Sequence, residues 1–368
     1  MEERDIPARI RTFKMKETIL QHYKIYPRSE LQDFFKLIHQ SEFGPGHLVV
    51  NPKENFKHLA AEYENLAETS VDQVIEILQP QLCRLHLEVL RQTTLSIKTL
   101  QKFFEISARE KRGDIDSYLK KISELKELCS DGSLPFTENN VERFVTEKIK
   151  PDPTGLFRHS RKYREAYAPA YRVVEKRFCD VLPLFARIDD LMHERKQIVI
   201  AIDGDCAAGK TTLSHALKEV YNCNIIPIDH FFLRPEQRTD ERLTKPGGNI
   251  DHERFIEEVL NNLNTNKDFS YQPFNCMIQN FDAPVLLSPE KLTIIEGSYS
   301  HHPFLAERYD LKIFLSIPED VQLNRILKRN GMTMYDKFKN IWIPMEKKYA
   351  AALGIKERSD LQFYYLNN

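Results

Sequence analysis

The sequence predicts two domains: a mostly α-helical N-terminal domain at 1–193 and, at 194–368, an α/β domain with a mainly parallel sheet. Three observations support this division. Residues 1 to about 190 repeat apolar side chains at helical spacing, with few glycines and no convincing alternating strand. Residues 197 to about 317 instead alternate short β-branched runs with helices. The chain of 368 residues is also too long for one ordinary core, and the charged stretch MHERK at 192–196 suits a domain junction.

The composition disfavours several classes of protein. Lys and Arg number 53 and Asp and Glu 54, so the net charge of -1 creates no overall attraction to nucleic acid or to an anionic membrane. The six cysteines show no CxxC spacing, the N-terminus has no apolar signal region, and no apolar run reaches the length of a membrane span. We therefore expect a soluble, cytoplasmic protein that uses neither a membrane nor nucleic acid as its partner.

The first clear helix signal begins at Ser29. Ser29-Glu-Leu-Gln32 fits a capping box, in which the Ser29 hydroxyl accepts from a backbone N–H and Gln32 bonds back to the cap. Apolar residues then recur at helical spacing to about residue 40. The Gly-Pro-Gly sequence at 44–46 forbids continuation, so we expect Glu42 and His47 to be exposed on a loop.

Segment 159–172 interleaves basic and aromatic side chains, and its tyrosines recur every four residues. One interpretation is a helix that packs its tyrosines on the core beside solvated arginines. The other is a second pocket for an anion or a substrate, formed together with Glu42 and His47. The residues of the segment concerned are His159, Tyr163, Arg164, Tyr167, Tyr171 and Arg172.

A buried strand begins at Ile198, and a glycine-rich turn at 204–211 joins it to an amphipathic helix. The turn, GDCAAGKT, fits the pattern GxxxxGK[ST] of a phosphate-binding loop, in which successive N–H groups converge on the phosphates of a nucleoside triphosphate. Lys210 then meets the β and γ oxygens, Thr211 ligates Mg²⁺, and the positive end of the helix dipole faces the anion. The expected nucleotide-binding residues are Gly204, Asp205, Cys206, Ala207, Ala208, Gly209, Lys210, Thr211 and Thr212.

Cys206 lies within this loop and allows two interpretations. A helix N-terminus favours the thiolate, so oxidation of Cys206 would switch off nucleotide binding. Alternatively, cysteine serves there only as a small residue in a tight turn.

Two later strands end in carboxylates. The strand before Asp229 and the strand before Glu296 are apolar, and in doubly wound folds the carboxyl ends of strands carry the chemistry. Asp229 is the candidate base for an attacking hydroxyl, and the candidate metal ligands are Thr211, Asp229 and Glu296. The alternatives are that Asp229 only caps the next helix and that Glu296 pairs with an arginine.

A further strand at 311–317 leads into a helix that begins at Pro318 and stops at Gly331. Arg325 and Arg329 are four residues apart on one face of this helix, so both can reach a shared anion. Phosphoryl transfer needs such donors for the charge that develops on the oxygens, and a closing lid delivers them. A solvated basic face is the alternative.

Five motifs, in this order, resemble the uridine kinase and phosphoribulokinase branch of the P-loop kinases, in particular its bacterial uridine kinase-like members. They are GDCAAGKTT, IDHFF, GGNIDHERF, IIEGSYS and YDLKIFLSIPEDVQLNRILKRNG, within about 197 to 355. The resemblance implies transfer of the γ-phosphoryl group of ATP, with Mg²⁺, to a hydroxyl of a small molecule. By the same resemblance Lys210, Asp229, Arg325 and Arg329 are the catalytic residues. The first domain is similar to a helical module of unknown role fused to such kinases.

The sequence departs from this family where uridine kinases recognise the nucleoside. The family has P-x-Y-D-F followed by a histidine, whereas this chain reads Gln-Pro-Phe-Asn-Cys at 272–276 with no histidine close behind. A nucleoside acceptor is therefore doubtful, because polar groups of a ligand left unpaired are strongly penalised. The cationic segment 234–249 suits an acidic or phosphorylated acceptor as well as a sugar, and the alternative is a solvated loop that contacts only ATP. The candidate substrate residues are Arg234, Arg238, Arg242, Phe274 and Tyr299.

A second class of function is a regulatory ATP-binding switch or ATPase in which the helical domain is the effector. Guanine selectivity is unsupported, because Asn266-Lys267-Asp268 lacks the spacer of the NKxD pattern. A kinase for a small-molecule hydroxyl acceptor and a switch differ in whether ATP turnover depends on an added acceptor.

Overall fold

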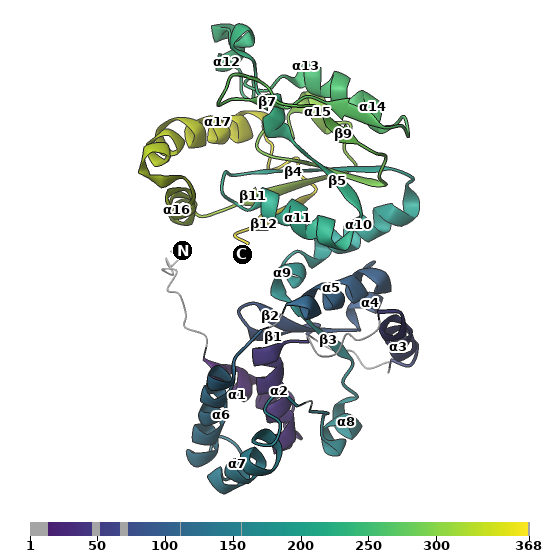
Figure 1. Ribbon diagram of the computed structural model, residues 1–368, viewed down its shortest axis with the longest axis vertical. Helices are drawn as coiled ribbons and strands as arrows, with labels where there is room; N and C mark the ends of the chain where they lie inside the picture. Colours follow the sequence, from purple (N-terminus) through teal and green to yellow (C-terminus); the bar gives the residue numbers. More distant parts are fainter. Residues whose placement is uncertain (1–13, 46–51, 67–72, 111, 156, 367–368) are drawn as a thin grey trace. The chain divides into compact units, whose positions relative to one another are not determined.

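The computed structural model describes residues 14–45, 52–66, 73–110, 112–155 and 157–366, and it divides into two compact units, Met1–Leu182 and Pro183–Asn368 (Figure 1). The division falls after the first residue of helix α10 (Leu182–Glu194), a helix that the sequence prediction placed in the first domain. Tyr221 of the second unit donates hydrogen bonds to the carbonyl of Phe185 at 3.3 Å and to the carboxylate of Asp189 at 2.9 Å. These bonds tie α10 to the second unit.

Helices dominate the first unit, as the sequence predicted. Their apolar stripes meet in a core built mainly from α1, α2 and α6, with residues such as Phe34, Phe35 and Leu125 fully buried. The helices are α1 (Met15–Ile25), α2 (Leu31–Phe43), α3 (Pro52–Glu64), α4 (Val89–Gln92), α5 (Ile97–Arg109), α6 (Ile115–Ser130), α7 (Glu138–Phe144) with the π-helical turn Val145–Ile149, α8 (Arg161–Tyr167) and α9 (Lys176–Cys179).

The first unit also contains a three-stranded antiparallel sheet that the sequence analysis missed. Its order is β1-β2-β3, with bounds Ile75–Gln79, Leu82–His86 and Tyr171–Glu175. The middle strand β2 is buried at all five positions, including Arg84 and His86. Because its buried positions carry both polar and apolar residues, the strand lacks the alternation by which half-buried strands are recognised.

The predicted capping box of Ser29 and Gln32 is wrong. The Ser29 hydroxyl donates to the carbonyl of Tyr26 at 2.7 Å and Gln32 donates to the carbonyl of Arg158 at 2.6 Å. The cap is Glu30 instead, whose N–H donates to the carboxylate of Asp33 at 2.9 Å. Glu30 and Asp33 therefore form the capping box that was predicted for Ser29 and Gln32, one residue later in the sequence.

Helix α2 extends to Phe43, so the expectation that Glu42 lies on an exposed loop is also wrong. Glu42 is 7% exposed, forms an ion pair with Lys121 at 2.8 Å and accepts from the Ser117 hydroxyl at 2.9 Å. His47 lies outside the described residues. A pocket that uses Glu42 as a free ligand group is therefore excluded.

The tyrosines at 163, 167 and 171 do not form one helical stripe. Helix α8 ends because Ala168 has φ +40°, and Tyr171 then begins β3. Tyr163 is 1% exposed and stacks on His159, which agrees with the interpretation that the tyrosines pack on the core. Arg164 is exposed on α8.

The second unit has the predicted α/β fold, with a five-stranded sheet in the order β12-β11-β4-β10-β5 in which every neighbouring pair is parallel. The central strand β4 (Ile198–Gly204) is buried at all seven positions, which explains its continuous apolar run. The other strands are β5 (Cys223–Pro227), β10 (Leu292–Glu296), β11 (Leu311–Ser316) and β12 (Leu361–Tyr364).

Helices flank this sheet, and small hairpins extend from it (Figure 1). None of the described helices has the length and apolarity needed to cross a membrane. The helices are α11 (Lys210–Val220), α12 (Asp240–Thr244), α13 (His252–Phe255), α14 (Asn261–Leu263), α15 (Pro303–Ala306), α16 (Glu319–Lys337) and α17 (Ile343–Leu353), with short turns at Ile228–Phe231, Pro235–Gln237, Ile256–Leu260 and Phe338–Trp342. The hairpins pair β6 (Phe269–Tyr271) with β9 (Val285–Leu287) and β7 (Phe274–Asn275) with β8 (Asn280–Phe281).

Strand register brings the sequence motifs to one edge of the sheet. Glu296 pairs in register with Ile202 of β4 and with Pro227 of β5, so the carboxyl ends of the three strands lie together. The phosphate-loop pattern, Asp229 and Glu296 therefore meet at this edge, as expected for a doubly wound sheet. Helix α16 is interrupted at Gly331, which has φ +73° and ψ 176°, where the sequence predicted its end.

Candidate active site

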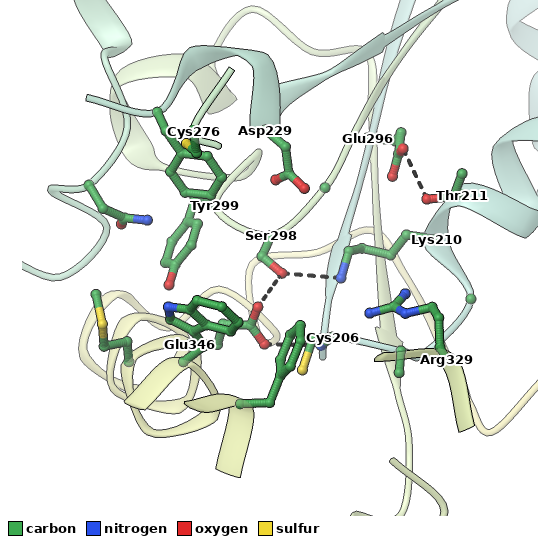
Figure 2. Close-up of a pocket in the computed structure, with 18 of the residues that line it drawn as sticks. Cys206, Lys210, Thr211, Asp229, Cys276, Glu296, Ser298, Tyr299, Arg329 and Glu346 are labelled. Carbon is green, nitrogen blue, oxygen red and sulfur yellow. Dashed lines mark hydrogen bonds between the residues drawn. The ribbon is translucent and has the colours of Figure 1, made fainter. Parts of the chain in front are cut away.

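A cavity of about 710 Å³ opens at this edge of the sheet in the second unit (Figure 2). It is lined by the phosphate-loop segment, by residues that follow β5 and β10, and by residues of α16 and α17. Its volume lies within the range of ordinary small-molecule sites.

The segment 204–209 forms a tight loop between β4 and α11. Gly204 and Gly209 have φ +134° and +105°, and a Cβ at Gly204 would lie 2.1 Å from the carbonyl oxygen of Leu315. The Lys210 ammonium donates to the carbonyls of Gly204 at 2.7 Å and Asp205 at 3.0 Å. This side chain is therefore held folded across the loop, with its charge at the position that a phosphate chain would occupy.

Asp203, the last residue but one of β4, connects this strand to the turn after β10 and to α17. It is 1% exposed and accepts from the N–H of Tyr299 at 3.2 Å, from the N–H of His301 at 2.9 Å and from the hydroxyl of Tyr349 at 2.9 Å. The N–H of Gly204 is a fourth donor, at 2.6 Å, so this buried carboxylate fixes the turn after β10 to the start of the phosphate loop. The sequence analysis missed Asp203, because an aspartate within a strand has no local signature of this role.

Thr211 and Glu296 face each other across the start of helix α11. The Thr211 hydroxyl donates to Glu296 Oε1 at 3.1 Å, and Glu296 is 6% exposed (Figure 2). Within the described part of the chain, no arginine lies at ion-pair distance from Glu296, so the alternative that this residue pairs with an arginine is wrong.

Asp229 lies on the turn Ile228–Phe231 directly after β5 and faces the cavity (Figure 2). No hydrogen-bond partner of its carboxyl is found among the described residues, and it does not cap a helix. Asp229 is exposed to the open cavity, and desolvation by the surrounding protein, with a smaller contribution from the charge of Glu296, raises the pKa of its carboxyl to about 6. Gly297 permits this position, because a Cβ there would lie 3.2 Å from Asp229 Oδ1.

The oxygen ligands around Thr211 fit a magnesium ion that is shared with a nucleotide. No group of three His, Cys, Asp or Glu side chains that could hold a metal alone is present in the described part of the chain. Mg²⁺ in nucleotide sites is typically held by one or two carboxylates together with phosphate oxygens. Glu296 raises the pKa of Asp229, so a cation near both carboxylates would relieve their repulsion.

Glu346 of α17 reaches into the phosphate loop from the far side of the cavity (Figure 2). Its Oε2 accepts from the N–H of Cys206 at 3.0 Å, and its Oε1 accepts from the Ser298 hydroxyl at 2.8 Å. Ser298 in turn accepts from the Lys210 ammonium at 3.1 Å. A carboxylate therefore occupies donors that phosphate oxygens use in a loop of this kind.

Replacing Glu346 with glutamine should tighten the binding of MgATP by about tenfold. The substitution removes a negative charge that competes with the phosphates for the Cys206 N–H and for Ser298. Calorimetric titration of the full-length variant measures the change. Glu357→Gln, an exposed carboxylate beyond α17, is the matched control and should leave the Kd unchanged. Equal or weaker binding by Glu346→Gln would show that Glu346 does not compete with nucleotide.

Arg325 and Arg329 of α16 both line the cavity, whereas the neighbouring Lys328 does not. Arg325 donates to the carbonyls of Ala207 at 3.1 Å and Leu366 at 3.0 Å. Arg329 is exposed and donates to the side chain of Asn330 at 2.8 Å. The guanidinium of Arg325 is thus fixed against the phosphate loop, while that of Arg329 lies at the cavity mouth.

The candidate substrate residues divide into two groups. Arg238 and Tyr299 line the cavity, together with Asn249, Cys276 and Trp342, which the sequence analysis did not select. Arg234, Arg242 and Phe274 are not among the lining residues, and each is engaged elsewhere.

The reason differs for each of these three. Arg234 pairs with Glu236 at 3.2 Å and Arg242 pairs with Glu253 at 2.7 Å. Phe274 is 3% exposed in β7 and packs edge-on against Phe281. Charge pairing within the segment 234–253 thus leaves Arg238 as its one arginine at the cavity, which weakens the prediction of a strongly anionic acceptor.

Cys206 does not match the prediction of a thiolate. It is 8% exposed, and burial together with the charge of Glu346 raises the pKa of its thiol to about 12. The interpretation that cysteine is a small residue in a tight turn agrees with this environment, because a protonated, buried thiol reacts slowly with oxidants.

The parallel sheet and the glycine loop between β4 and α11 define a P-loop fold in the second unit. Residues 199–334 match the model of the Phosphoribulokinase / Uridine kinase family, which confirms the resemblance over that segment. No curated protein matches the chain.

Solved structures are similar to the chain over about half its length. A possible uridine kinase from Bacillus stearothermophilus has 19% identity and a TM-score of 0.35, with 49% of this chain and 99% of that chain covered. A candidate fructose transport system kinase from Silicibacter sp. TM1040 has 21% identity and a TM-score of 0.37, with 45% and 89% covered. The D-glycerate 3-kinase of Cryptococcus neoformans has 15% identity and a TM-score of 0.29, with 46% and 84% covered. Similarity at this level does not identify a substrate.

Proposed function

We propose that the second unit transfers the γ-phosphoryl group of ATP to a hydroxyl group of a small molecule. The observation that carries this proposal is the position of Asp229. Its carboxyl has no hydrogen-bond partner among the described residues and faces a cavity whose other wall is the phosphate loop. A carboxylate in this position serves an acceptor, whereas a switch that only binds nucleotide does not need one.

The residues divide the chemistry among them. The N–H groups of 204–209 and Lys210 hold the phosphates, and Thr211 with Glu296 holds Mg²⁺, which neutralises charge on the phosphates when bound. Asp229, with a pKa of about 6, is ionised at neutral pH and accepts the proton of the acceptor hydroxyl. Arg325 and Arg329 stabilise the charge that develops on the transferred group.

The acceptor contacts the part of the cavity beyond Asp229. Arg238, Asn249 and Tyr299 are polar side chains of the cavity lining to which the nucleotide chemistry gives no role, and Phe232 and Trp342 provide apolar surface. A small hydroxyl compound, such as a sugar or a polyol with at most one acidic group, fits this combination. The uridine kinase histidine and aspartate remain absent from 272–276, so a nucleoside is not favoured.

Screening a metabolite library for acceptor-dependent ADP production tests the proposal. A kinase shows ATP turnover that rises severalfold with one or a few hydroxyl compounds, and a phosphate monoester accumulates in step with ADP. Turnover that is the same with and without every compound, and yields only inorganic phosphate, would support the regulatory ATPase instead.

Arg329→Gln should lower kcat for phosphoryl transfer by about 10²-fold while changing the KM for ATP little. The arginine lies at the cavity mouth and contributes chiefly when charge develops on the transferred oxygens. Steady-state kinetics with the identified acceptor measure this effect. Lys328→Gln removes an adjacent positive charge outside the cavity and should retain normal kinetics. If both variants lose activity equally, the basic face acts only through its overall charge.

A further inference from the structure

The first unit contains a cavity of its own, of about 300 Å³, between α2, α3, α5 and β3. Its polar lining residues include Lys36, Gln40, His58, His159, Tyr171 and Arg172. Among the described residues that line it, none is aspartate or glutamate. The nucleotide chemistry proposed above uses no residue of this cavity.

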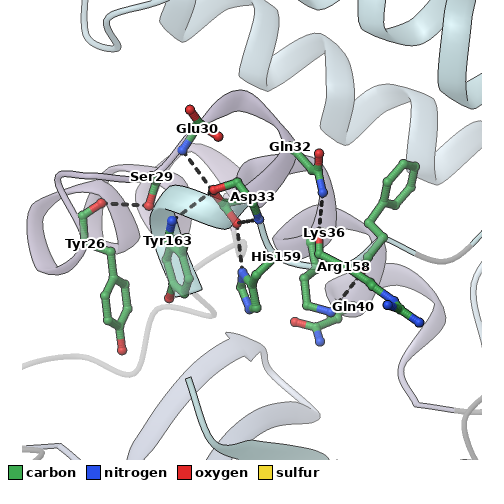
Figure 3. A network of polar contacts seen from close by, with 12 residues as sticks. Tyr26, Ser29, Glu30, Gln32, Asp33, Lys36, Gln40, Arg158, His159 and Tyr163 are labelled. Carbon is green, nitrogen blue, oxygen red and sulfur yellow. Dashed lines mark hydrogen bonds and ion pairs between the residues drawn. The ribbon is translucent and has the colours of Figure 1, made fainter. Parts of the chain in front are cut away.

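A buried hydrogen-bonded chain forms one side of the cavity. Asp33 is 0% exposed and accepts from His159 Nδ1 at 2.9 Å and from the Ser160 hydroxyl at 2.7 Å (Figure 3). His159 Nε2 lies 2.6 Å from the hydroxyl of Tyr171. Burial lowers the pKa of His159 to about 4, so the ring is neutral at pH 7. Its Nδ1–H therefore donates to Asp33 and its Nε2 accepts from Tyr171.

Arg84 holds Gln40, another residue of the cavity lining, through its guanidinium group. It is fully buried, and its guanidinium donates to Gln40 Oε1 at 2.8 Å and to Glu76 at 3.2 Å. The same guanidinium lies 4.6 Å from the ring centre of Tyr171. Because the Gln40 carbonyl oxygen is committed to Arg84, the donors of this side chain are its amide N–H groups, and Nε2 lies 3.4 Å from the Tyr171 hydroxyl, another group of the cavity lining.

Lys36 is the most informative residue of the cavity. Its ammonium donates to the carbonyl of Phe157 at 2.8 Å, and no carboxylate lies at ion-pair distance from it in the described part of the chain. Burial, with a smaller contribution from Arg84, lowers its pKa to about 8, and the charge of Asp33 opposes this shift only in part. A partly buried ammonium without a counter-ion destabilises a fold, and a bound anion would supply the missing charge.

Arg172 adds a second cation at the cavity wall. It pairs with Glu62 at 2.8 Å, a residue that does not line the cavity, and its guanidinium lies 5.7 Å from the ring centre of Phe104. Lys36, Gln40 and Arg172 therefore line one space, and among the described residues no carboxylate lines it, which is the pattern of an anion-binding site.

We propose that the first unit binds a small organic anion, with its carboxylate or phosphate group held by the Lys36 ammonium and the Gln40 amide. The Tyr171 hydroxyl, oriented by His159 and Asp33, accepts a hydrogen bond from the rest of the ligand. Glu42 is not part of this site, and Arg164 is not among the lining residues, in contrast to the second pocket considered from the sequence.

Nuclear magnetic resonance of the full-length protein labelled with ¹⁵N-histidine tests this site. Inorganic phosphate and succinate are titrated separately, and the ring signals of His159, assigned with His159→Asn, report binding in this cavity rather than at the phosphate loop. We expect saturable shifts with at least one of the two probes. Phosphate alone indicates a phosphorylated ligand, succinate alone a carboxylate, and both a general anion site. Shifts with neither probe would overturn the proposal.

Variants at Lys36 separate binding from folding. Lys36→Gln retains a donor for the Phe157 carbonyl and should weaken the probe affinity about tenfold or more without lowering the Tm. Lys36→Arg should restore most of the affinity. Lys57→Gln, an exposed residue of α3 outside the lining, should bind like the wild type. Unchanged affinity in Lys36→Gln would overturn the assignment, and if that variant does not fold, Lys36→Met provides the same comparison.

Discussion

Lys210→Ala abolishes phosphoryl transfer, with kcat/KM for ATP lowered by at least about 10³-fold. The Lys210 ammonium lies across the phosphate loop, held by the carbonyls of Gly204 and Asp205 and by Ser298. In a phosphate-binding loop this charge neutralises the β and γ oxygens, and most of the transfer chemistry is positioning and electrostatic stabilisation. Steady-state kinetics with the acceptor found by screening measure the loss.

The same substitution should change the Tm by only a few degrees. The aliphatic part of Lys210 packs at the start of α11, but its ammonium serves the loop and not the apolar core. Thermal unfolding followed by circular dichroism checks this. Lys218→Ala, a lysine near the end of the same helix, is the matched control and should keep full activity. Wild-type turnover in Lys210→Ala would remove the loop from the mechanism.

Asp229→Asn should lower kcat by 10² to 10⁴-fold, the usual range for loss of a general base, while the KM for ATP changes little. The amide keeps the shape of the side chain but cannot take the proton of the acceptor. In the wild type, kcat/KM for the acceptor should fall about tenfold per pH unit below pH 6, because the pKa of Asp229 is raised to about 6. The acid limb should be absent from the residual activity of Asp229→Asn.

The stability of this variant gives an independent readout. The folded-state pKa of Asp229 lies above its ordinary value of 3.8, so the folded protein holds this proton more tightly than the unfolded chain. Asp229 therefore contributes stability below about pH 4, and this contribution is lost as the pH rises through about 6. At pH 7.5 Asp229→Asn should be at least as thermostable as the wild type. A clear drop in Tm together with near-normal kcat would identify Asp229 as a structural residue.

Much of the candidate site could be predicted from the sequence because its signals are local. The strand, glycine loop and helix around Lys210 are contiguous, and Asp229 and Glu296 each follow an apolar strand directly. Parallel pairing then brings these strand ends to one edge without further information. Arg325 and Arg329 were found in the same way, from their spacing on one helix.

The residues that were missed depend on contacts between distant parts of the chain. Glu346 bonds to Cys206 across 140 positions, and neither residue carries a sign of this pairing in its own segment. Asp203 is a buried strand residue whose donors come from the turn after β10 and from α17. In the first unit, the strand β2 was missed because Arg84 is satisfied by Gln40 and Glu76 and so occupies a buried position that the sequence pattern assigns to apolar residues.

For the candidate substrate residues, a local signal in the sequence selected more residues than line the cavity. The run of arginines from 234 to 242 looks like an anion site in the sequence, yet two of its three arginines pair with glutamates within or close to that segment. In the first unit, Lys36 has no such pairing among the residues that the structure describes, and only the fold reveals this feature.

Titration of the full-length protein with ATP by calorimetry, with and without Mg²⁺, tests the central claim most directly. If the segment 204–212 is a nucleotide-binding loop, MgATP binds once per chain, the affinity falls without magnesium, and Glu346→Gln binds more tightly than the wild type. If no purine nucleoside triphosphate gives measurable heat under any of these conditions, the loop does not bind nucleotide and the proposed phosphoryl transfer is wrong.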